Sequence, residues 1–454
     1  MLSLFTSLVS ILIASQADFD RLEQDLKKEL QCKPDEVTVI FQPGNYRFKD
    51  NHLYLYGMDC PDTRLVIKGN GAILEGTAPS REVSTFYRAD RLVEVVDAGK
   101  KLCRIRTWKR LPGTGDLSIQ VTSWYRLFSG PVTEIKGRYL YFTAEYLERS
   151  GLAYNINGDF TFGQQRPRFR LIREREAQGP VSSVAFNFTA SHFSEVDISG
   201  FTFRGNAGCM SMDSMNFLLR FYACQAGKFS VRECVFQSIR SDVIRIAYTD
   251  GVEVRNCRFR DCSRIGVMSY NHSARTSVVG NVFERMGLDA EVTPCVKCQG
   301  SDYLVSANRF IDYGCCAVMA GVHFSEEMKY PSSGVIERNE IYQTESYRKE
   351  APQNLLMDTG AIYVNTQNAS LEIRGNNIHD ISGPHANRGI FCDDGTVNTY
   401  IHNNSVLRVD NSYCIDLRRA LSVETRPDSK IRRVNVGNRV ENNQVDGKIR
   451  FEQR

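Results

Sequence analysis

The hydrophobic pattern after residue 190 repeats a short template. It consists of an aliphatic residue, two further positions, a position that we call the ladder position, one more residue and then an apolar residue. Successive ladder positions lie 23 to 39 residues apart. A recurring unit of this size, built from short strands, is typical of a solenoid. The copies are Ile198/Phe201/Phe203, Val231/Cys234/Phe236, Val254/Cys257/Phe259, Val278/Asn281/Phe283, Val305/Asn308/Phe310, Ile336/Asn339/Ile341, Ile373/Asn376/Ile378, Ile401/Asn404/Val406 and Val440/Asn443/Val445.

Asparagine occupies the ladder position in every copy from Asn281 onward. A polar residue at an inward-facing turn needs hydrogen-bond partners, and stacked asparagines can supply them to one another and to the turn backbone. Cys234 and Cys257 occupy the position in two earlier copies, where a free thiol acts as a small apolar filler. We therefore predict an internal ladder that runs along the solenoid.

The segment before the repeats predicts a cap. Residues 18–31 place Phe19, Leu22, Leu26 and Leu30 at helical spacing. Short alternating segments separated by turn residues follow up to residue 80. A helix at the start of a stack covers a core and strand edges that would otherwise face water. We expect residues 18–80 to form a cap helix and the first coils.

The rhythm changes between residues 81 and 185, where longer alternating strands replace the short repeat. We interpret this region as an inserted β-rich subdomain, and residues 186–454 as the main solenoid. Both tryptophans, Trp108 and Trp124, lie in the insertion. Their rings could stack on a sugar, although packing in a core is the ordinary use of such residues.

Residues 1–17 are apolar, carry no charged side chain and end in small residues at Ser15-Gln16-Ala17. This pattern predicts a signal peptide and therefore a secreted or periplasmic protein. A buried strand or helix is the alternative interpretation. The run is too short for a comfortable membrane span, so we expect no membrane span.

Net charge and cysteine spacing bear on two functions, nucleic-acid binding and metal binding. A net charge of +4 over 454 residues is too dilute to indicate a nucleic-acid partner. Fourteen cysteines could form some disulfides in an exported protein. Cys295-x-x-Cys298 with Cys315-Cys316 resembles a zinc-ligand spacing, but the first pair lies inside a predicted strand. We therefore expect no metal site.

Two consecutive repeats point to a candidate site. The aromatic residues Tyr363 and Phe391 each lie thirteen residues before a ladder asparagine, and the same count assigns Met268 and Cys295 to their column. Because strand side chains alternate between the two faces, the residues two positions further on also point outward. This count gives an outward column of Tyr270, Lys297, Asn365 and Asp393, and matching of the apolar patterns in two further strands adds Gly321, with His323 nearby, and Asp416.

Polar side chains on an outer face are ordinary, so a solvated sheet face is the alternative to a sugar-binding groove. However, stacked like charges such as Asp393 and Asp416 are unfavourable in a sheet and favour a functional use. Arg388 lies in the loop beside this face. We predict that the groove binds substrate through the following residues: Asp416, Asn365, Lys297, His323, Tyr270, Arg388 and Tyr363.

Residues 193–450 resemble a right-handed parallel β-helix of the pectate-lyase-like superfamily, and the cap and insertion resemble those of bacterial β-helix glycoside hydrolases. The residues that carry the resemblance are Asp358-Thr359-Gly360-Ala361-Ile362-Tyr363 and, one coil later, Gly389-Ile390-Phe391-Cys392-Asp393-Asp394-Gly395. The resemblance implies an all-β fold, a right-handed parallel β-helix solenoid with an N-terminal cap helix and an inserted β-rich subdomain. This superfamily contains several chemistries, so the fold alone does not assign the reaction.

The resemblance also implies that Asp358, Asp393 and Asp394 are catalytic. A glycosidase needs two carboxylates, one to protonate the leaving oxygen and one to act as nucleophile or base. Polygalacturonase-like members carry Asn-Thr-Asp where this chain has Asn365-Thr366-Gln367, and no Gly-His-Gly follows. We therefore expect a glycoside hydrolase of another specificity, acting on a plant or host glycan.

Two other functions remain open at this point. A polysaccharide lyase would use Lys297 or an arginine as the base and calcium to neutralise a uronate. A glycan-binding β-helix without activity would need none of the acids. Apart from that calcium we expect no cofactor, and we expect a monomer whose partner is an oligo- or polysaccharide.

Overall fold

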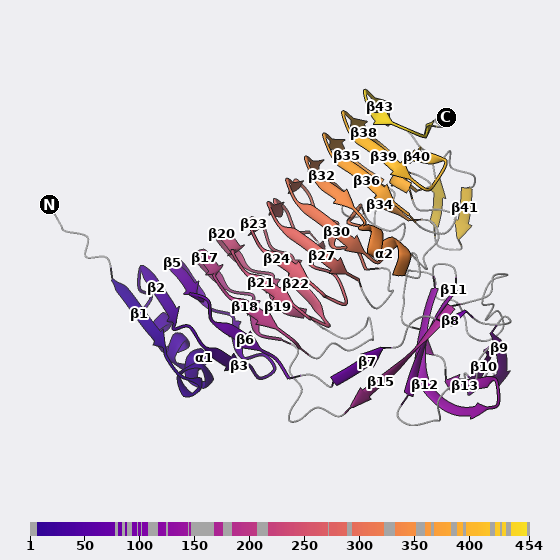
Figure 1. Ribbon diagram of the computed structural model, residues 1–454. Helices are drawn as coiled ribbons and strands as arrows, with labels where there is room; N and C mark the ends of the chain where they lie inside the picture. The colour runs from indigo at the N-terminus through magenta and orange to yellow at the C-terminus, as the bar shows by residue number, and fades with distance from the viewer. Residues whose placement is uncertain are drawn as a thin grey trace.

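The structure is a computed structural model (Figure 1). It describes residues 7–77, 80–83, 87–88, 93–97, 99–100, 102–107, 117–123, 126–143, 145–146, 168–175, 184–206, 217–270, 272–287, 293–321, 332–350, 359–364, 367–382, 388–393, 396–417, 423–426, 429–432 and 437–451.

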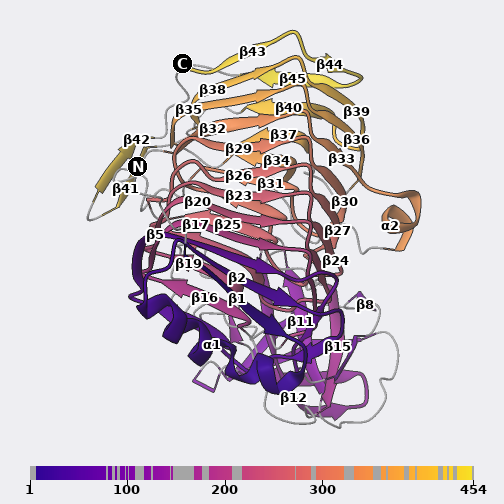
Figure 2. The same cartoon turned by 90° about the vertical axis from the view of Figure 1, so that its left-hand side faces the viewer.

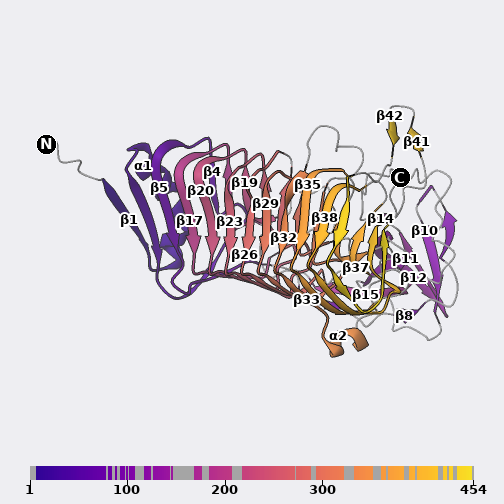
Figure 3. The same ribbon diagram turned by 90° about the horizontal axis from the view of Figure 1, so that it is seen from above.

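Three long parallel sheets form the faces of one solenoid and extend along its axis, as Figures 2 and 3 show from two directions. Sheet A contains β1 (Leu8–Ile13), β2 (Glu36–Phe41), β5 (Asp59–Lys68), β17 (His192–Ser199), β20 (Gln225–Arg232), β23 (Val252–Arg255), β26 (Ser277–Val279), β29 (Tyr303–Ser306), β32 (Ser332–Glu337), β35 (Gln367–Arg374), β38 (Val397–His402) and β43 (Arg439–Glu441).

Sheet B contains β3 (Asn45–Arg47), β6 (Ile73–Glu75), β18 (Thr202–Arg204), β21 (Val235–Gln237), β24 (Arg258–Arg260), β27 (Val282–Met286), β30 (Arg309–Tyr313), β33 (Glu340–Tyr342), β36 (Asn377–Ile381), β39 (Ser405–Val409) and β44 (Gln444–Val445). Sheet C contains β4 (Leu53–Tyr56), β16 (Phe186–Thr189), β19 (Phe217–Tyr222), β22 (Asp242–Ala247), β25 (Val267–Tyr270), β28 (Val296–Cys298), β31 (Val318–Ala320), β34 (Gly360–Val364), β37 (Arg388–Cys392), β40 (Tyr413–Leu417) and β45 (Lys448–Phe451). The predicted parallel β-helix is confirmed.

The repeat template describes the interior of this stack. The aliphatic positions pair in register along sheet A from Ile198 to Val440, and the final apolar positions pair along sheet B from Phe203 to Val445. The phenylalanines of sheet B stack face to face, with ring centroids 4.5 Å apart between Phe259 and Phe283. These buried rings and aliphatic side chains form one continuous core.

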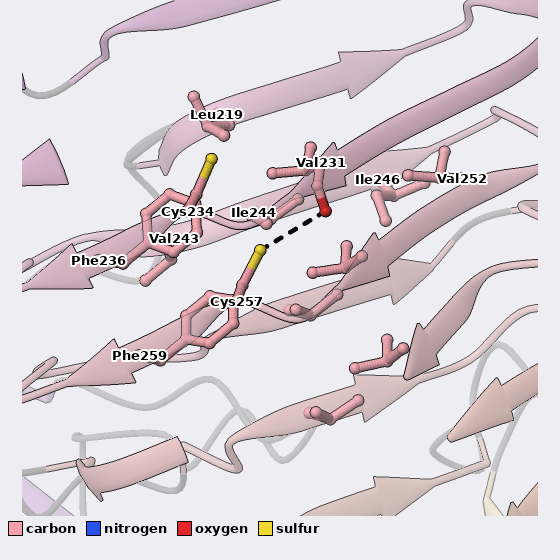
Figure 4. Close-up of a cluster of buried hydrophobic side chains, with 14 of the residues drawn as sticks. Leu219, Val231, Cys234, Phe236, Val243, Ile244, Ile246, Val252, Cys257 and Phe259 are labelled. Atoms are coloured by element: carbon pink, nitrogen blue, oxygen red, sulfur yellow. Dashed lines mark hydrogen bonds between the residues drawn. The ribbon is translucent and has the colours of Figure 1, made fainter. Parts of the chain in front are cut away.

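The ladder asparagines make the predicted hydrogen bonds. From Asn281 to Asn404, each side-chain amide donates to the Oδ1 of the next asparagine at 2.9–3.0 Å. The backbone N–H of each asparagine donates to the same Oδ1 at 2.9–3.1 Å. In the earlier coils the thiols of Cys234 and Cys257 fill this position among apolar side chains, and Cys257 Sγ donates to the Val231 carbonyl (Figure 4). The ladder therefore satisfies buried polar groups at the turn between sheets A and B.

Helix α1 (Gln16–Gln31) covers the first coil (Figure 1). It buries the four predicted residues Phe19, Leu22, Leu26 and Leu30. Ser15 is its N-cap, and the Ser15 side chain accepts a hydrogen bond from the backbone N–H of Asp18. Strand β1, which precedes the helix, pairs along its whole length with β2. Residues 8–13 thus form a strand of the sheet, and cleavage near Ala17 stays a prediction.

Between β6 and β16 the chain leaves the solenoid. It forms a mostly antiparallel sheet with its own core, in the order β7 (Ser80–Val83), β15 (Arg168–Arg175), β11 (Leu117–Ser123), β12 (Arg126–Lys136), β13 (Tyr139–Thr143), β10 (Leu102–Arg106) and β9 (Glu94–Asp97). The short strands β8 (Tyr87–Arg88) and β14 (Glu145–Tyr146) pair with β15 and β12. Trp108 and Trp124 lie outside the described residues. Helix α2 (Glu345–Glu350) and the hairpin of β41 (Val423–Arg426) and β42 (Ser429–Arg432) are further additions to the coils.

Candidate active site

The outer face of sheet C carries a continuous column of side chains. Strand pairing places the following residues next to one another, one per coil: Lys297, Met319, Tyr363, Phe391, Asp416 and Arg450. Ile362 and Val364, on either side of Tyr363, are fully buried in the core, so Tyr363 points away from it. Adjacent coils in such a stack lie about 4.8 Å apart.

The predicted outward column is wrong at two positions. Lys297 pairs with Met268 and Met319, so it lies in the column of Tyr363 and not in that of Asp393. Asp416 pairs with Phe391 and is likewise displaced by two residues from the position beside Asp393. The cause is the connection between sheets C and A. Lys297 lies eleven residues before its ladder asparagine, whereas Met268, Tyr363 and Phe391 lie thirteen residues before theirs.

Tyr363 and Asp393 form the central polar contact of the site. The Tyr363 hydroxyl donates a hydrogen bond to Asp393 Oδ2 at 2.6 Å. Asp393 follows β37 directly, and its backbone N–H donates to the Val364 carbonyl at 3.0 Å. The carbonyl of Asp393 accepts hydrogen bonds from the backbone N–H and the hydroxyl of Thr396. The carboxylate is therefore held in a defined place at the edge of the sheet, half-buried beside an aromatic ring.

Asp416 is fully buried and is not a group that a sugar could contact. Arg388 and Arg450 both donate to its carboxylate, and the two Arg450 contacts measure 2.6 Å. The guanidinium of Arg388 lies over the Phe391 ring at 4.0 Å, and that of Arg450 over Tyr413 at 4.3 Å. This cluster joins three successive strands of sheet C. Arg388 and Asp416, which we predicted to bind substrate, thus have a structural role, and Arg450 is a partner that sequence reasoning missed.

The remaining predicted residues divide into two groups. Tyr270 is half-buried at the end of β25, where the guanidinium of Arg245 lies 4.9 Å from its ring. Asp358, Asp394, Asn365 and His323 lie outside the described residues. The first residue of β34, Gly360, pairs with Arg388, at the opposite end of the strand from Asp393.

Buried thiols lie beneath the aromatic surface. Cys315, Cys316 and Met319 form a small cluster against which Tyr363 packs. Burial raises the pKa of Cys316 and also that of Cys392, next to Asp393, so both remain protonated. Within the described part of the chain, no three His, Cys, Asp or Glu side chains converge on a position for a metal ion, and this includes the predicted cysteine group. The thirteen described cysteines are all free thiols.

Comparison with known proteins identifies the architecture. A family model described as a right-handed β-helix region matches residues 218–406. The chain is a right-handed parallel β-helix. Among curated proteins none matches the sequence. Within the described residues, no helix of this β-helix is long and apolar enough to cross a membrane.

Solved structures that match this chain are remote in sequence. A protein titled glycoside hydrolase is 10% identical, with a TM-score of 0.59 and 96% of each chain covered. A DFA-IIIase from Arthrobacter chlorophenolicus A6, in complex with DFA-III, is 8% identical at a TM-score of 0.35, with 99% of this β-helix and 86% of the other chain covered. A family 28 exopolygalacturonase from Yersinia enterocolitica is 12% identical at a TM-score of 0.25, with 97% and 79% covered. Because the sequence identity is so low, the likeness to the protein titled glycoside hydrolase shows the fold alone.

Proposed function

We propose that this β-helix is a glycoside hydrolase whose active site lies around Asp393, on the outer face of sheet C. The observation that carries the proposal is the hydrogen bond of 2.6 Å between the Tyr363 hydroxyl and Asp393. It fixes a half-buried carboxylate beside the partly exposed ring of Tyr363, which packs against the buried ring of Phe391 with centroids 5.5 Å apart. Acids placed beside aromatic surfaces suit the binding and cleavage of sugars.

In this proposal Asp393 accepts a hydrogen bond, which suits the nucleophile or the base that activates water. The second carboxylate, which protonates the leaving oxygen, is Asp394 or Asp358. Asn365 contacts the sugar, and Tyr363 orients Asp393. The fold-level relative titled glycoside hydrolase, which matches along 96% of both chains, is compatible with this chemistry.

We also propose that the substrate is an oligo- or polysaccharide of plant or host origin and that the protein acts after export. The apolar segment that ends at Ala17 supports export. The same segment includes β1, so an exported chain cut at this point would lose the first strand of sheet A.

A panel of aryl glycosides and polysaccharides, assayed with and without a chelator, tests the proposed reaction. On any substrate that the parent cleaves, Asp393→Asn should lower turnover by a factor of about 100 or more, the scale of acid–base or nucleophilic catalysis. Tyr363→Phe should lower it roughly tenfold, because one hydrogen bond to a charged group is lost. Asp302→Asn is the matched control, since Asp302 is an exposed acid between β28 and β29.

Each alternative predicts a different result. Full activity in Asp393→Asn would move the active site to another face. Cleavage restricted to uronates and abolished by chelation would indicate the lyase, with Lys297 as the next residue to test. Glycan affinity without any cleavage in the parent would indicate a binding protein.

A further inference from the structure

Two arginines stand side by side on the outer face of sheet C, far from Asp393. Arg220 on β19 pairs in register with Arg245 on β22, so the two side chains occupy directly opposite positions on neighbouring strands. Both are half-buried. Like charges placed directly opposite in a sheet are destabilising, and the two strands lie only about 4.8 Å apart.

Among the described residues no carboxylate neutralises this pair. Neither guanidinium forms an ion pair, and Arg245 Nε is buried without a hydrogen-bond partner. Burial lowers the pKa of Arg220, and the charge of Arg245 lowers it further. Most other described arginines on the solenoid pair with an acid, for example Arg232 with Asp197 and Arg258 with Glu284. The pair is thus an uncompensated concentration of positive charge.

Aromatic side chains surround the two guanidiniums. Arg220 lies 4.2 Å from the centroid of Tyr222 and 5.1 Å from that of Phe217, and Arg245 lies 4.9 Å from that of Tyr270. The exposed rings of Tyr248 and His272 continue this surface. The Tyr248 ring packs edge-on against Tyr222, with centroids 5.4 Å apart, and stacks on His272, with centroids 5.6 Å apart. Cation–π contacts with tyrosine stabilise each guanidinium at this surface. Both arginine side chains are partly exposed.

The pair also lies in line with the candidate active site. The column that contains Tyr363 extends back along the stack through Met319, Lys297 and Met268 to Arg245 and Arg220. Five strand-to-strand steps separate β22 from β37, which bears Phe391 and leads into Asp393. At about 4.8 Å per step the separation is roughly 24 Å, which an oligosaccharide can span.

We propose that Arg220 and Arg245 form a binding site for a negatively charged sugar, with its carboxylate or sulfate between the two guanidiniums and its ring against the neighbouring tyrosines. A planar guanidinium pairs with carboxylate and sulfate oxygens through two parallel hydrogen bonds. The aromatic surface selects a sugar over a free inorganic anion, because sugar rings bury apolar C–H faces against tyrosine. The site goes beyond the proposed hydrolysis, since it requires binding and no bond cleavage.

Calorimetric titration of the full chain tests this site with three probes: an oligogalacturonate, a sulfated heparin oligosaccharide and a neutral galacto-oligosaccharide. We expect at least one charged probe to bind at least tenfold more tightly than the neutral one, and its affinity to fall with salt. The comparison of the two charged probes identifies carboxylate or sulfate as the preferred group.

Matched variants locate the binding. Arg220→Gln and Arg245→Gln should each weaken the charged probe about tenfold or more, since each loses hydrogen bonds to a charged group. Arg258→Gln removes the same charge from sheet B and should bind as the parent does. Thermal melts should show both site variants folded, because the substitutions relieve repulsion. Equal affinity for charged and neutral probes, or parent-like binding by both site variants, would overturn the proposal.

The two proposals fail independently. Asp393→Asn should still bind the charged probe at least tenfold more tightly than the neutral one, because the preference for charge comes from the arginine pair about 24 Å away. Loss of charged-probe binding in Asp393→Asn with parent-like binding in Arg220→Gln and Arg245→Gln would place the anion at the candidate active site and contradict the separate site. If the parent cleaves no substrate but binds charged probes through Arg220 and Arg245, the proposed binding site is supported and the proposed hydrolase activity is contradicted.

Discussion

At the residue scale, one backbone conformation recurs at the corner between sheets A and B. The residue before each ladder position has a positive φ, between 52° and 71°. The set comprises Gly200, Glu233, Asn256, Gly280, Ala307, Arg338, Gly375, Asn403 and Asn442. This left-handed residue turns the chain so that the following asparagine points inward. For a residue with a Cβ, the conformation costs about 1–2 kcal/mol.

Equivalent corners should therefore respond to glycine and alanine in opposite directions. Ala307→Gly should stabilise the protein by roughly 0.5–1 kcal/mol, because removal of the left-handed strain outweighs the added entropy of the unfolded chain. Gly375→Ala should destabilise it by about 1 kcal/mol, since a Cβ there meets only an ordinary contact at 3.8 Å and the cost is conformational. Urea denaturation measures both. Equal effects of the same sign would contradict this account of the corner.

Asp416 offers a second prediction at this scale. Asp416→Asn removes the buried carboxylate that both Arg388 and Arg450 contact, so the free energy of unfolding should fall by about 3 kcal/mol or more. Asp302→Asn, at an exposed position, should change it by less than about 0.5 kcal/mol. Denaturation midpoints compare the two. A neutral Asp416→Asn would show that the cluster does not join the strands of sheet C energetically.

At the element scale, the sequence predicts the solenoid well and the site only in part. Two signals agree in every coil of sheets A and B from Ile198 onward: an apolar residue at each inward position and a ladder residue at a fixed offset from it. Sheet C lacks such an internal marker. Its strands connect to sheet A through segments of variable length, so a fixed count of thirteen places Tyr363 and Phe391 correctly and misplaces Lys297 by two residues. Asp416 is misplaced by the same amount because it is aligned by its apolar neighbours, and Ile415 pairs with Ile390.

Strand β1 and the N-cap of α1 give the element-scale prediction. Deletion of residues 1–17 removes strand β1, which pairs with β2 and contributes the buried side chain of Ile13. The free energy of unfolding should therefore fall by at least about 2 kcal/mol. Ser15→Ala, which removes only the cap, should cost about 1 kcal/mol. Denaturation of the three proteins gives the comparison. Intact mass of protein from the native host tests export, which predicts a mature chain that begins near Asp18.

At the scale of the whole molecule, buried thiols report on the integrity of the stack. Cys32 is exposed, and the other twelve described cysteines are buried along the solenoid and in the insertion. Burial raises the pKa of Cys224 to about 11 and that of Cys262 and Cys298 to about 12. Only the thiolate reacts with alkylating reagents, so these groups should be inert at neutral pH while the coils are closed.

Alkylation with iodoacetamide at pH 8, followed by peptide mass spectrometry, should therefore label Cys32 among the thirteen described cysteines of the folded protein. In urea all thirteen should react, because the unfolded thiols have their ordinary pKa of about 8.5. Labelling of Cys234 or Cys257 in the absence of urea would show that the middle coils open on their own.

The inserted sheet does not interrupt the pairing of the coils on either side of it. Phe186 on β16 pairs with Leu53 on β4, and Thr202 on β18 pairs with Ile73 on β6, although a whole additional sheet lies between them in the chain. A coil hydrogen-bonds only to the coils before and after it. The corner that carries the insertion therefore admits a whole extra sheet while the coils on either side still pair strand to strand. The cost is one register shift between β5 and β17, at Phe193 to Glu195.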